Sequence, residues 1–536
     1  MKYNSKAMLQ AISLAIILLL LSEGTGHCFL KILHLEKIGF TAPIGVAIMF
    51  SFLQILYLPR LCLGGPFGWI KVCSTIVLII GLIACFYSYK EMFKTLFRAR
   101  TIYVIIACAM MAGLFYLCKT NLAVSNDAEL QLMAKNVDSS SIMLENNRLQ
   151  GYEMFGSLVI WMFQGNLEYT ALSLAIFATM ISVMLALDMI DSFDIGNPWF
   201  RFTLIFFAVF YYQFYSWKIA GAFQGGNWRI IFISLGLFTL YEWLKTKREN
   251  IKYLLPFVIF AGMFSHNGFL MIGFEMVYLS SVYLFHIKKI RSLYDVTTFL
   301  IPVIIYCAAW LSKYSKLAGI IVILVAIVFY LARMKRSFYL KIIHFEDFLI
   351  DHSWKLFFVA IPLVFLVGTF FLRYFTIRYS IPYSEYIRFF SSKGIGSALF
   401  LDGSILDYVL DIFRWGGMIV FLMRANKEEE KMMRMIFLGM VAFFINPLCM
   451  GMLAQITGLE MYAHAFEIIF NPFTDVMIFY WIYKQFEWTV IGQWVLELTL
   501  VITCVLGHVS SFTNHPSGLY TDLLTRDTQS GKVILP

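Results

Sequence analysis

The stretch from Thr101 to Asn136 reads TIYVIIACAMMAGLFYLCKTNLAVSNDAELQLMAKN. Its first half is apolar up to Cys118, and polar and acidic residues follow closely. An apolar run of roughly 20 residues is long enough to cross a bilayer as a helix. The stretch therefore predicts one membrane-spanning helix that ends at a membrane edge and leads into a polar loop.

The composition of the rest of the chain agrees with a membrane protein. Of 536 residues, 60% are hydrophobic, 18% are aromatic and only 14% are charged, whereas soluble proteins have about 25% charged residues. Apolar runs recur along the chain, and the alternating segments of a β-barrel do not. The sequence therefore predicts an all-α fold, a polytopic transmembrane helical bundle. The net charge of +9 lies in short clusters between the runs, which is the pattern that orients helices rather than one that binds nucleic acid.

The apolar runs predict spans at about 7–31, 40–57, 70–87, 101–118, 168–187, 199–216, 228–244, 253–265, 267–285, 295–311, 317–332, 355–372, 405–423, 435–453, 468–483 and 488–507. Five basic clusters lie between them, at 90–100, 245–252, 288–291, 333–341 and 424–434. An even number of spans separates each cluster from the next, so all five can face the cytoplasm together.

This topology places residues 119–167 and 373–404 in long extracytoplasmic loops and residues 508–536 in an extracytoplasmic tail. Residues 1–100 form N-terminal transmembrane segments, and residues 101–507 form the main transmembrane domain. The orientation of the N-terminus is open at this point, because Lys2 and Lys6 precede the first span although the count places them outside. A re-entrant early segment is the alternative.

The loop at 119–167 predicts two amphipathic helices that lie on the membrane surface. Ser125, Asn126 and Asp127 are all residue types that begin helices, and a periodic segment follows each polar turn. Asp127 then has two interpretations. It is either a helix cap beside a solvated Glu129, or a general base that stays ionised and reaches a substrate hydroxyl.

Several cations fall on the outer side, although Lys and Arg normally favour the cytoplasmic loops. Lys218 and Arg229 lie in the segment SWKIAGAFQGGNWR, and three arginines accompany tyrosines in RYFTIRYSIPYSEYIR. Arginine beside aromatic residues suits a lipid phosphate or a sugar. The alternative is ordinary interfacial snorkelling. His266 stands at an outer turn, where a plain helix connection is the other interpretation.

Other motifs do not occur in the sequence. It has no phosphate-binding loop, no zinc-protease motif and no paired acidic D-x-D in the opening loop. No cofactor and no metal site are therefore expected.

The order of these features resembles the GT-C class of membrane glycosyltransferases. The segment NDAELQLMAKNVDSSSI, from Asn126 to Ile142, is similar to the D-D-A-x-Y loop of a large bacterial GT-C-like family. The segment YEMFGSLVIWMFQGNLEYTALS resembles the entry to the following span, and QGGNWRIIFISLGLF is similar to a Q-G-K segment. Asn126 replaces the first acid and Leu130 the aromatic residue, and Arg229 is the cation nearest to the expected lysine. The likeness covers roughly residues 101–290.

The resemblance implies a metal-independent enzyme that moves a sugar from a polyprenyl-phosphate donor to a cell-envelope glycan or lipid acceptor. It implies an active site at the outer face of a bacterial plasma membrane, with membrane lipids as further partners. The expected catalytic base is Asp127. The expected substrate-binding residues are Asn126, Glu129, Glu153, Lys218, Gln224, Arg229, His266, Arg373, Arg378, Tyr379, Tyr383 and Arg388. The alternatives are a lipid-linked polysaccharide flippase and an envelope polysaccharide polymerase.

Overall fold

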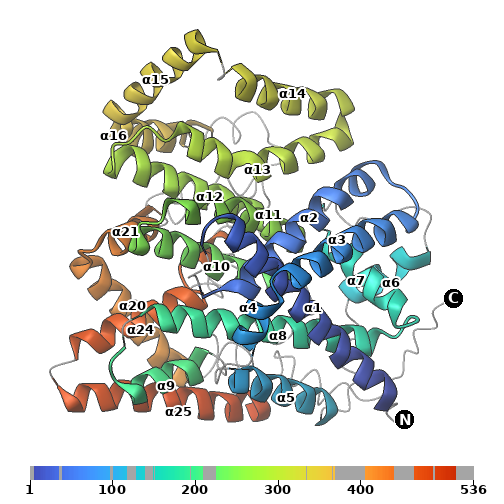
Figure 1. The fold of residues 1–536 in the computed structure, drawn as a ribbon. Coiled ribbons are helices and arrows are strands. Elements are labelled where there is room, and N and C mark those ends of the chain that lie inside the picture. Colours follow the sequence, from blue (N-terminus) through green and yellow to red (C-terminus); the bar gives the residue numbers. More distant parts are fainter. Residues whose placement is uncertain are drawn as a thin grey trace.

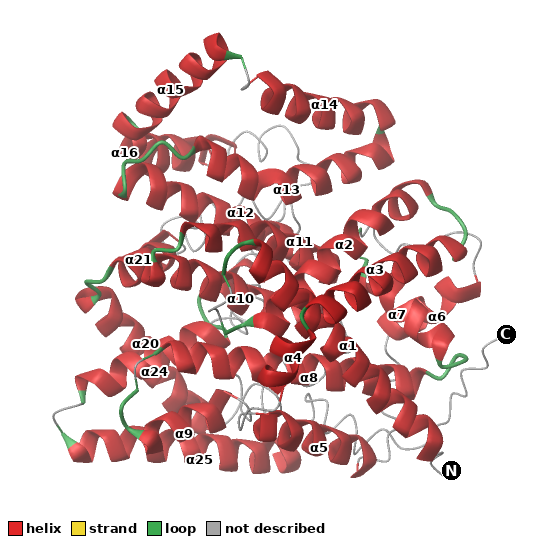
Figure 2. Ribbon diagram, viewed as in Figure 1, coloured by secondary structure: helices red, strands yellow, loops and turns green. Residues whose placement is uncertain are grey.

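The computed structural model describes residues 5–35, 39–96, 101–117, 128–138, 149, 151–193, 195–208, 225–332, 335–364, 366–368, 405–439, 464–486 and 489–514. Within these ranges every regular element is a helix (Figures 1 and 2). The predicted all-α class is confirmed for this part of the chain.

The first half of the chain supplies α1 (Ser5–Ile32), α2 (Thr41–Leu63), α3 (Gly68–Tyr87), α4 (Tyr89–Leu96), α5 (Thr101–Leu117), α6 (Ala128–Asp138), α7 (Tyr152–Met162), α8 (Leu167–Ser192), α9 (Pro198–Phe206) and α10 (Gly225–Thr246). Local signals fix several of the boundaries. The Asn166 side chain accepts a hydrogen bond from the backbone N–H of Tyr169 and so caps α8. Asn197 caps α9 in the same way, and Pro198 occupies the first turn, where its missing N–H costs nothing.

The second half supplies η3 (Glu249–Leu254), α11 (Leu255–Ser265), α12 (Phe269–Ser281), η4 (Val282–Ile287), α13 (Leu293–Tyr314), α14 (Lys316–Ala332), α15 (Arg336–Asp351), α16 (Ser353–Lys355), η5 (Leu356–Ala360), α20 (Ile405–Arg424), α21 (Glu428–Gly439), η7 (Phe466–Ile468), α24 (Pro472–Gln485) and α25 (Val490–Asn514). Asn471 and Thr474 form a reciprocal capping box at the start of α24.

Six helical segments are long and apolar enough to cross a membrane: Leu9–Ile32, Thr41–Leu63, Gly68–Tyr87, Tyr169–Ser192, Phe269–Ile287 and Leu293–Ser312. A seventh span is possible if the bent pair Ser337–Asp351 and Ser353–Gly368, which meet at 71°, counts as one. The other expected spans are shorter, carry more charge, or run into residues outside the described ranges. The chain is therefore a polytopic helical membrane protein.

Three of the basic clusters, 245–252, 288–291 and 424–434, lie at one end of the bundle, which we call the basic end. Their contacts are Asn250 with Leu33, Lys252 with Asp295, Lys288 with Glu428 and Arg291 with Asp347. This agrees with the even spacing of spans. It also places the end of α1 at the basic end and its beginning at the other end, although Lys2 precedes α1 and Lys6 lies in its first turn. That the basic end faces the cytoplasm stays a prediction.

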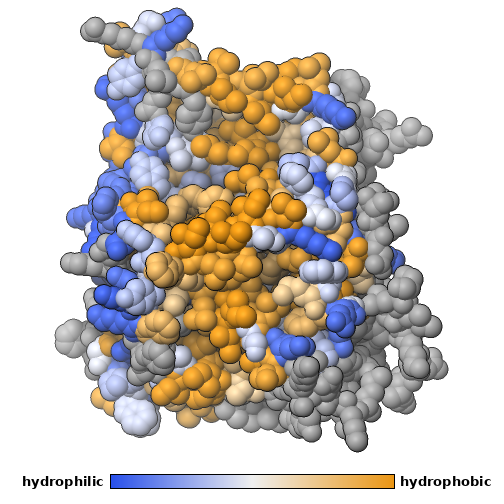
Figure 3. All heavy atoms as spheres, turned by 45° about the vertical axis from the view of Figure 1, so that its right-hand side comes forward, coloured by the Kyte–Doolittle hydropathy of each residue, from blue (hydrophilic) through white to orange (hydrophobic). Residues whose placement is uncertain are grey.

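The surface shows the same division. Figure 3 shows an apolar band that runs from top to bottom of the molecule, with the hydrophilic residues gathered along its two margins. We call the margin across the band from the basic end the opposite end. The turn between α2 and α3 lies at this end, close to the end of α13, because the Cys62 thiol contacts the backbone oxygen of Ala309.

The core is built around α8, whose membrane-spanning window is entirely buried. Close helix contacts elsewhere depend on glycine. A Cβ at Gly26 would lie 1.9 Å from the backbone oxygen of Thr41, and one at Gly45 would lie 1.7 Å from that of Ser22. Any side chain at either position would therefore force α1 and α2 apart. Small residues allow this kind of close approach between membrane helices.

The two helices expected in the loop at 119–167 are present as α6 and α7, but the expected surface placement of α7 is wrong. Its residues from Tyr152 to Ser157 are buried. The physical reason is an aromatic cluster, in which Tyr152 and Phe155 pack around Phe50 together with Phe264. Met133 of α6 is also fully buried. The two helices therefore form part of the packed bundle.

Candidate functional site

A cluster of charged and imidazole side chains lies at the opposite end of the bundle, and we call it the polar centre. It consists of Arg229, His266, His464 and Glu467. Arg229 lies near the start of α10, and His266 lies in the turn between α11 and α12. His464 and Glu467 lie in the short segment that leads into α24. Three segments that are far apart in the sequence therefore meet at one place.

Arg229 and Glu467 form a two-pronged ion pair. The Arg229 Nε donates to Glu467 Oε2 and Nη2 donates to Oε1, each at 2.7 Å. Both residues are buried, with 5% of Arg229 and 9% of Glu467 exposed. This parallel geometry is the strongest that arginine makes with a carboxylate.

Neighbouring side chains keep the Glu467 carboxyl ionised. Burial alone raises the pKa of the Glu467 carboxyl, but the nearby Arg229 and His464 lower it by more than burial raises it. The net result is a pKa well below the usual range for glutamate. Glu467 is therefore an ionised acceptor at every physiological pH, and it cannot donate a hydrogen bond.

The hydrogen bonds of His266 assign its tautomer. Its Nδ1 lies 3.0 Å from Arg229 Nη1 and also 3.0 Å from the backbone nitrogen of Gly268. A guanidinium and a backbone N–H are both donors only. The Nδ1 atom must therefore accept, and the proton of the neutral ring is on Nε2.

The hydrogen bond of His464 assigns the other tautomer. Its Nδ1 lies 3.1 Å from Glu467 Oε1. Since the ionised carboxylate can only accept, Nδ1 of His464 carries the proton. The lone pair of the neutral ring is then on Nε2. A carboxylate that binds an imidazole in this way fixes the tautomer and the orientation of the ring.

The two rings are neighbours with complementary chemistry. Their centroids are 5.2 Å apart and their planes are nearly perpendicular, at 88°. Nε2 of His266 carries a proton and is a hydrogen-bond donor, whereas Nε2 of His464 has a lone pair and is an acceptor. Both residues are partly exposed. The pair can therefore take a proton from one group and donate a hydrogen bond to another.

Glycines keep the surroundings of the polar centre open. A Cβ at Gly226 would lie 3.7 Å from Arg229 Nη1, in ordinary contact, whereas one at Gly268 would lie 3.0 Å from His266 Nδ1. Gly225 serves another purpose, because a Cβ there would lie 2.1 Å from the backbone oxygen of Ser265. The start of α10 can thus approach the end of α11, and this approach brings Arg229 to His266.

Neighbouring side chains fix the surrounding segments. Asn267 Oδ1 accepts from the backbone N–H of Leu149 at 3.3 Å and from the hydroxyl of Tyr306. Gln54 holds the same segment from the other side, with its amide nitrogen 2.9 Å from the Leu149 oxygen. Trp228 donates to the Tyr152 hydroxyl at 3.0 Å. These contacts give the polar centre a rigid support.

Two helices also begin beside the polar centre. Arg229 is the fifth residue of α10, and His266 lies three residues before the first residue of α12. The N-terminus of a helix carries a partial positive charge and free backbone N–H groups. The region around the two imidazoles therefore favours a ligand with negative charge.

Of the residues expected to form the site, Arg229 and His266 are brought together in the polar centre. Glu153 is buried in the first turn of α7, with 1% exposed. Glu129 lies in α6, but its side chain is outside the described part. The remaining expected residues lie outside the described ranges, and they stay predictions: Asp127, Asn126, Lys218, Gln224, Arg373, Arg378, Tyr379, Tyr383 and Arg388.

His464 and Glu467 were not singled out from the sequence. They lie in a segment interpreted only as an outer loop at 454–467. A local signal does exist, because a histidine and an acid three residues apart face each other across one helical turn. Their link to Arg229, which is 238 residues away, has no such signal.

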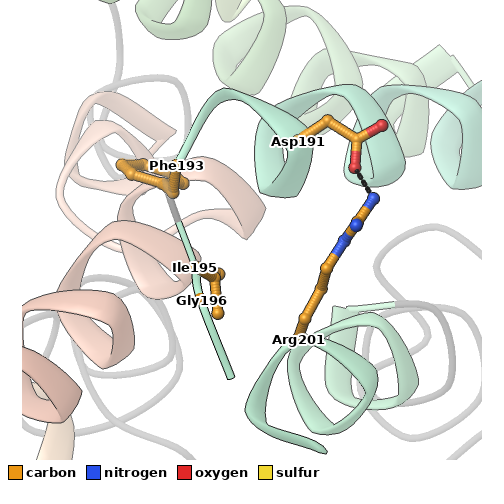
Figure 4. Close-up of a pocket in the computed structure, with 5 residues that line it drawn as sticks. All are labelled: Asp191, Phe193, Ile195, Gly196 and Arg201. Carbon is orange, nitrogen blue, oxygen red and sulfur yellow. Dashed lines mark hydrogen bonds and ion pairs between the residues drawn. The ribbon is translucent and has the colours of Figure 1, made fainter. Parts of the chain in front are cut away.

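A separate recess lies at the basic end (Figure 4). It has a volume of about 410 Å³ and is lined by Asp191, Phe193, Ile195, Gly196 and Arg201. Asp191 and Arg201 form an ion pair across it. These two side chains are about half exposed, so the pair is a surface feature, and the recess lies across the membrane band from the polar centre.

Among the residues that the structure describes, no group of three or more histidine, cysteine or acidic side chains is placed to hold a metal ion. No protein-family model matches the chain, and no curated protein matches it.

Proposed function

We propose that this protein is a membrane glycosyltransferase of the GT-C type, and that it moves a sugar from a polyprenyl-phosphate donor to a hydroxyl of a cell-envelope acceptor. The single observation that carries the proposal is the pair of imidazoles in complementary tautomers, His266 and His464, at one end of a membrane-spanning bundle. The proposed reaction takes place at this end, which faces outward if the basic end faces the cytoplasm.

The proposed transfer needs one base and one stabilised leaving group. The acceptor oxygen attacks the anomeric carbon, and the bond from that carbon to the phosphate oxygen breaks with its electron pair leaving on the phosphate. The acceptor proton moves to Nε2 of His464, which Glu467 orients. The Nε2–H of His266 donates a hydrogen bond to the departing phosphate, and the starts of α10 and α12 favour its charge.

Arg229 is a positioning residue in this scheme. Its Nε and Nη2 atoms bind Glu467, and Nη1 donates to His266. The guanidinium therefore fixes the tautomers of both imidazoles. This differs from the sequence-based expectation that Arg229 helps to hold the lipid phosphate, because its charge is already paired with Glu467.

Asp127 remains the rival base. Its place before α6 is outside the described ranges, so the assignment rests on the sequence resemblance. The two bases make different predictions, since one belongs to the loop at 119–167 and the other to the segment before α24. Only one of them should be essential for proton transfer.

The decisive experiment measures transfer from a polyprenyl-phosphate sugar by the purified protein in its His464→Gln and Asp127→Asn forms. Loss of the base lowers the rate by about 10²–10⁴-fold. We expect that loss for His464→Gln and a much smaller one for Asp127→Asn. His344→Gln is the matched control, because His344 is exposed on α15, outside the polar centre.

Two results would count against the proposal. Full activity of the His464→Gln protein would exclude His464 as the base. The absence of any transfer by the wild-type protein, with a panel of polyprenyl-phosphate sugars, would overturn the glycosyltransferase itself.

One observation favours a second candidate, a flippase for a lipid-linked glycan. A carrier needs polar sites at both faces of the membrane, and the recess with Asp191 and Arg201 supplies one at the basic end. Such a protein would move the labelled lipid between the leaflets of proteoliposomes without changing it. A chemically altered product separates the enzyme from the carrier.

A further inference from the structure

Arg60 is a buried arginine without a partner among the residues that the structure describes. It lies near the end of α2 and is 2% exposed. None of its three guanidinium nitrogens has a hydrogen-bond partner in this part of the chain. Arginine stays protonated in proteins, and an isolated buried charge is strongly unfavourable unless it is paired. An anion from outside the chain is the natural partner.

The position of Arg60 sets the kind of anion. Arg60 is one helical turn beyond Tyr57, whose hydroxyl contacts Ser74 of α3. It lies beside the turn between α2 and α3, since a Cβ at Gly65 would be 3.7 Å from Arg60 Nη1. Both glycines of this turn have positive φ, 76° at Gly64 and 140° at Gly65. Residues with a side chain rarely adopt this backbone conformation.

This turn lies at the depth of lipid headgroups. Trp69 donates its indole N–H to the backbone oxygen of Leu56 at 2.9 Å, and its ring is 44% exposed. Lys71 lies over the ring of Trp161, with Nζ 3.9 Å from the centroid. Tryptophan and lysine are typical of the boundary between the lipid chains and water. Lys71 also has no carboxylate partner among the described residues and adds a second positive charge.

The helix that follows offers a surface for a lipid chain. Only 28% of its membrane-spanning window is buried. Exposed apolar residues follow α3 along the depth of the membrane, among them Trp69, Val72, Ile76, Ile79, Ile83 and Phe86. A phosphate at the turn and an acyl or prenyl chain along this face would belong to the same molecule.

We propose that Arg60 anchors a lipid-phosphate site at the turn between α2 and α3, with Lys71 as its second cation and the exposed face of α3 as the support for the lipid chain. The site is distinct from the polar centre, and it does not depend on the proposed sugar transfer. The lipid phosphate neutralises the guanidinium and so stabilises the folded protein.

The test measures the thermal unfolding midpoint of the full chain, stripped of lipid in a neutral detergent. The probes are inorganic phosphate, a long-chain alkyl monophosphate and phosphatidylglycerol, with phosphatidylcholine as the background lipid. We expect both anionic lipids to raise the midpoint of the wild-type protein by several degrees. Arg60→Met should need at least about tenfold more lipid for the same rise, which corresponds to a tenfold loss of affinity.

Two further variants sharpen the test. Arg60→Lys keeps the charge without the planar fork and should retain part of the response. Lys31→Met removes a cation at the basic end, where Lys31 lies 4.8 Å from the ring of Tyr87, and should respond as the wild type does.

The behaviour without lipid gives an independent result. Because Arg60 has no partner among the described residues, Arg60→Met should be at least as stable as the lipid-free wild type. Failure of Arg60→Met to fold, or a lower midpoint, would show an essential partner within the chain and overturn the proposal. An unchanged lipid response in Arg60→Met would overturn it as well. If inorganic phosphate acts as strongly as the lipids, the anion site stands and the lipid assignment falls.

Discussion

Arg229 and Glu467 are joined by two parallel hydrogen bonds of 2.7 Å, although 238 residues separate them in the sequence. This pair connects α10 to the segment before α24. It also binds both imidazoles of the polar centre, because Arg229 contacts His266 and Glu467 contacts His464. Its contribution to stability depends on burial, because breaking a buried pair leaves one charge without compensation.

We expect Glu467→Gln to lower the free energy of unfolding by about 3–5 kcal/mol, because Arg229 then stays buried and charged without a counter-charge. Denaturant titration of the detergent-solubilised protein measures this loss. The double variant Arg229→Met with Glu467→Leu should recover much of it, since both charges are removed together. Equal losses in the single and double variants would contradict this account.

The ion pair also predicts a pH dependence. The pKa of Glu467 is lowered in the folded protein by Arg229 and His464, against the effect of burial. The stabilisation is therefore fully present above the pKa of an unfolded glutamate, about 4.3, and is lost as the pH falls from there toward the lower folded value. Part of the difference in unfolding free energy between wild type and Glu467→Gln comes from the ionised Glu467 carboxylate. This part should stay constant from pH 7 to 5 and shrink below pH 4. Midpoints measured at each pH test this, and a difference that grows on acidification would have the wrong sign.

Adjacent glycines at the start of α10 give a matched pair of variants. A Cβ at Gly225 would lie 2.1 Å from the backbone oxygen of Ser265, whereas one at Gly226 finds no atom closer than 3.7 Å. Gly225→Ala should lose about 1–3 kcal/mol of stability, because the backbone must move. Gly226→Ala should gain up to about 1 kcal/mol, because alanine favours the helix. If both variants behave alike in thermal unfolding, the close approach of α10 to Ser265 is wrong.

We expect that replacing Glu275 by an apolar residue stabilises the protein. It is 1% exposed in α12, and neither carboxyl oxygen has a hydrogen-bond partner within the described ranges. A buried polar group without a partner costs about 1–3 kcal/mol, so Glu275→Leu should raise the unfolding midpoint. Glu275→Gln keeps a polar group in the same place and should bring little gain. A clear loss of stability in Glu275→Leu would point to a partner that binds this carboxyl.

The sequence predicted the helices well where apolar runs are long and the boundary residues are good caps. The run from Tyr169 to Ser192 is one example, and Asn166 begins its helix as its residue type suggests. The interpretation of α7 as a surface helix failed. Its aromatic residues suit an interface and a packed core equally well, and only Phe50 and Phe264, far away in the sequence, distinguish the two.

The candidate site was predicted in part. Arg229 and His266 were among the predicted site residues, because each is a polar residue at the edge of a predicted span. The local sequence shows this property. The partners that give them a role, His464 and Glu467, reach them only through the packing of α24 on α10. Hydropathy and spacing describe one segment at a time, so they cannot indicate which two ends meet.

The wide separation of Arg229 and Glu467 has a consequence for biosynthesis. At a translation rate of about 5–20 residues per second, the 238 residues between them take roughly 12 to 48 s to emerge from the ribosome. Throughout that interval Arg229 has been made but Glu467, which supplies its counter-charge in the folded protein, has not. The pairing therefore waits for the segment before α24, and a chain truncated before residue 464 would lack the carboxylate that pairs with Arg229.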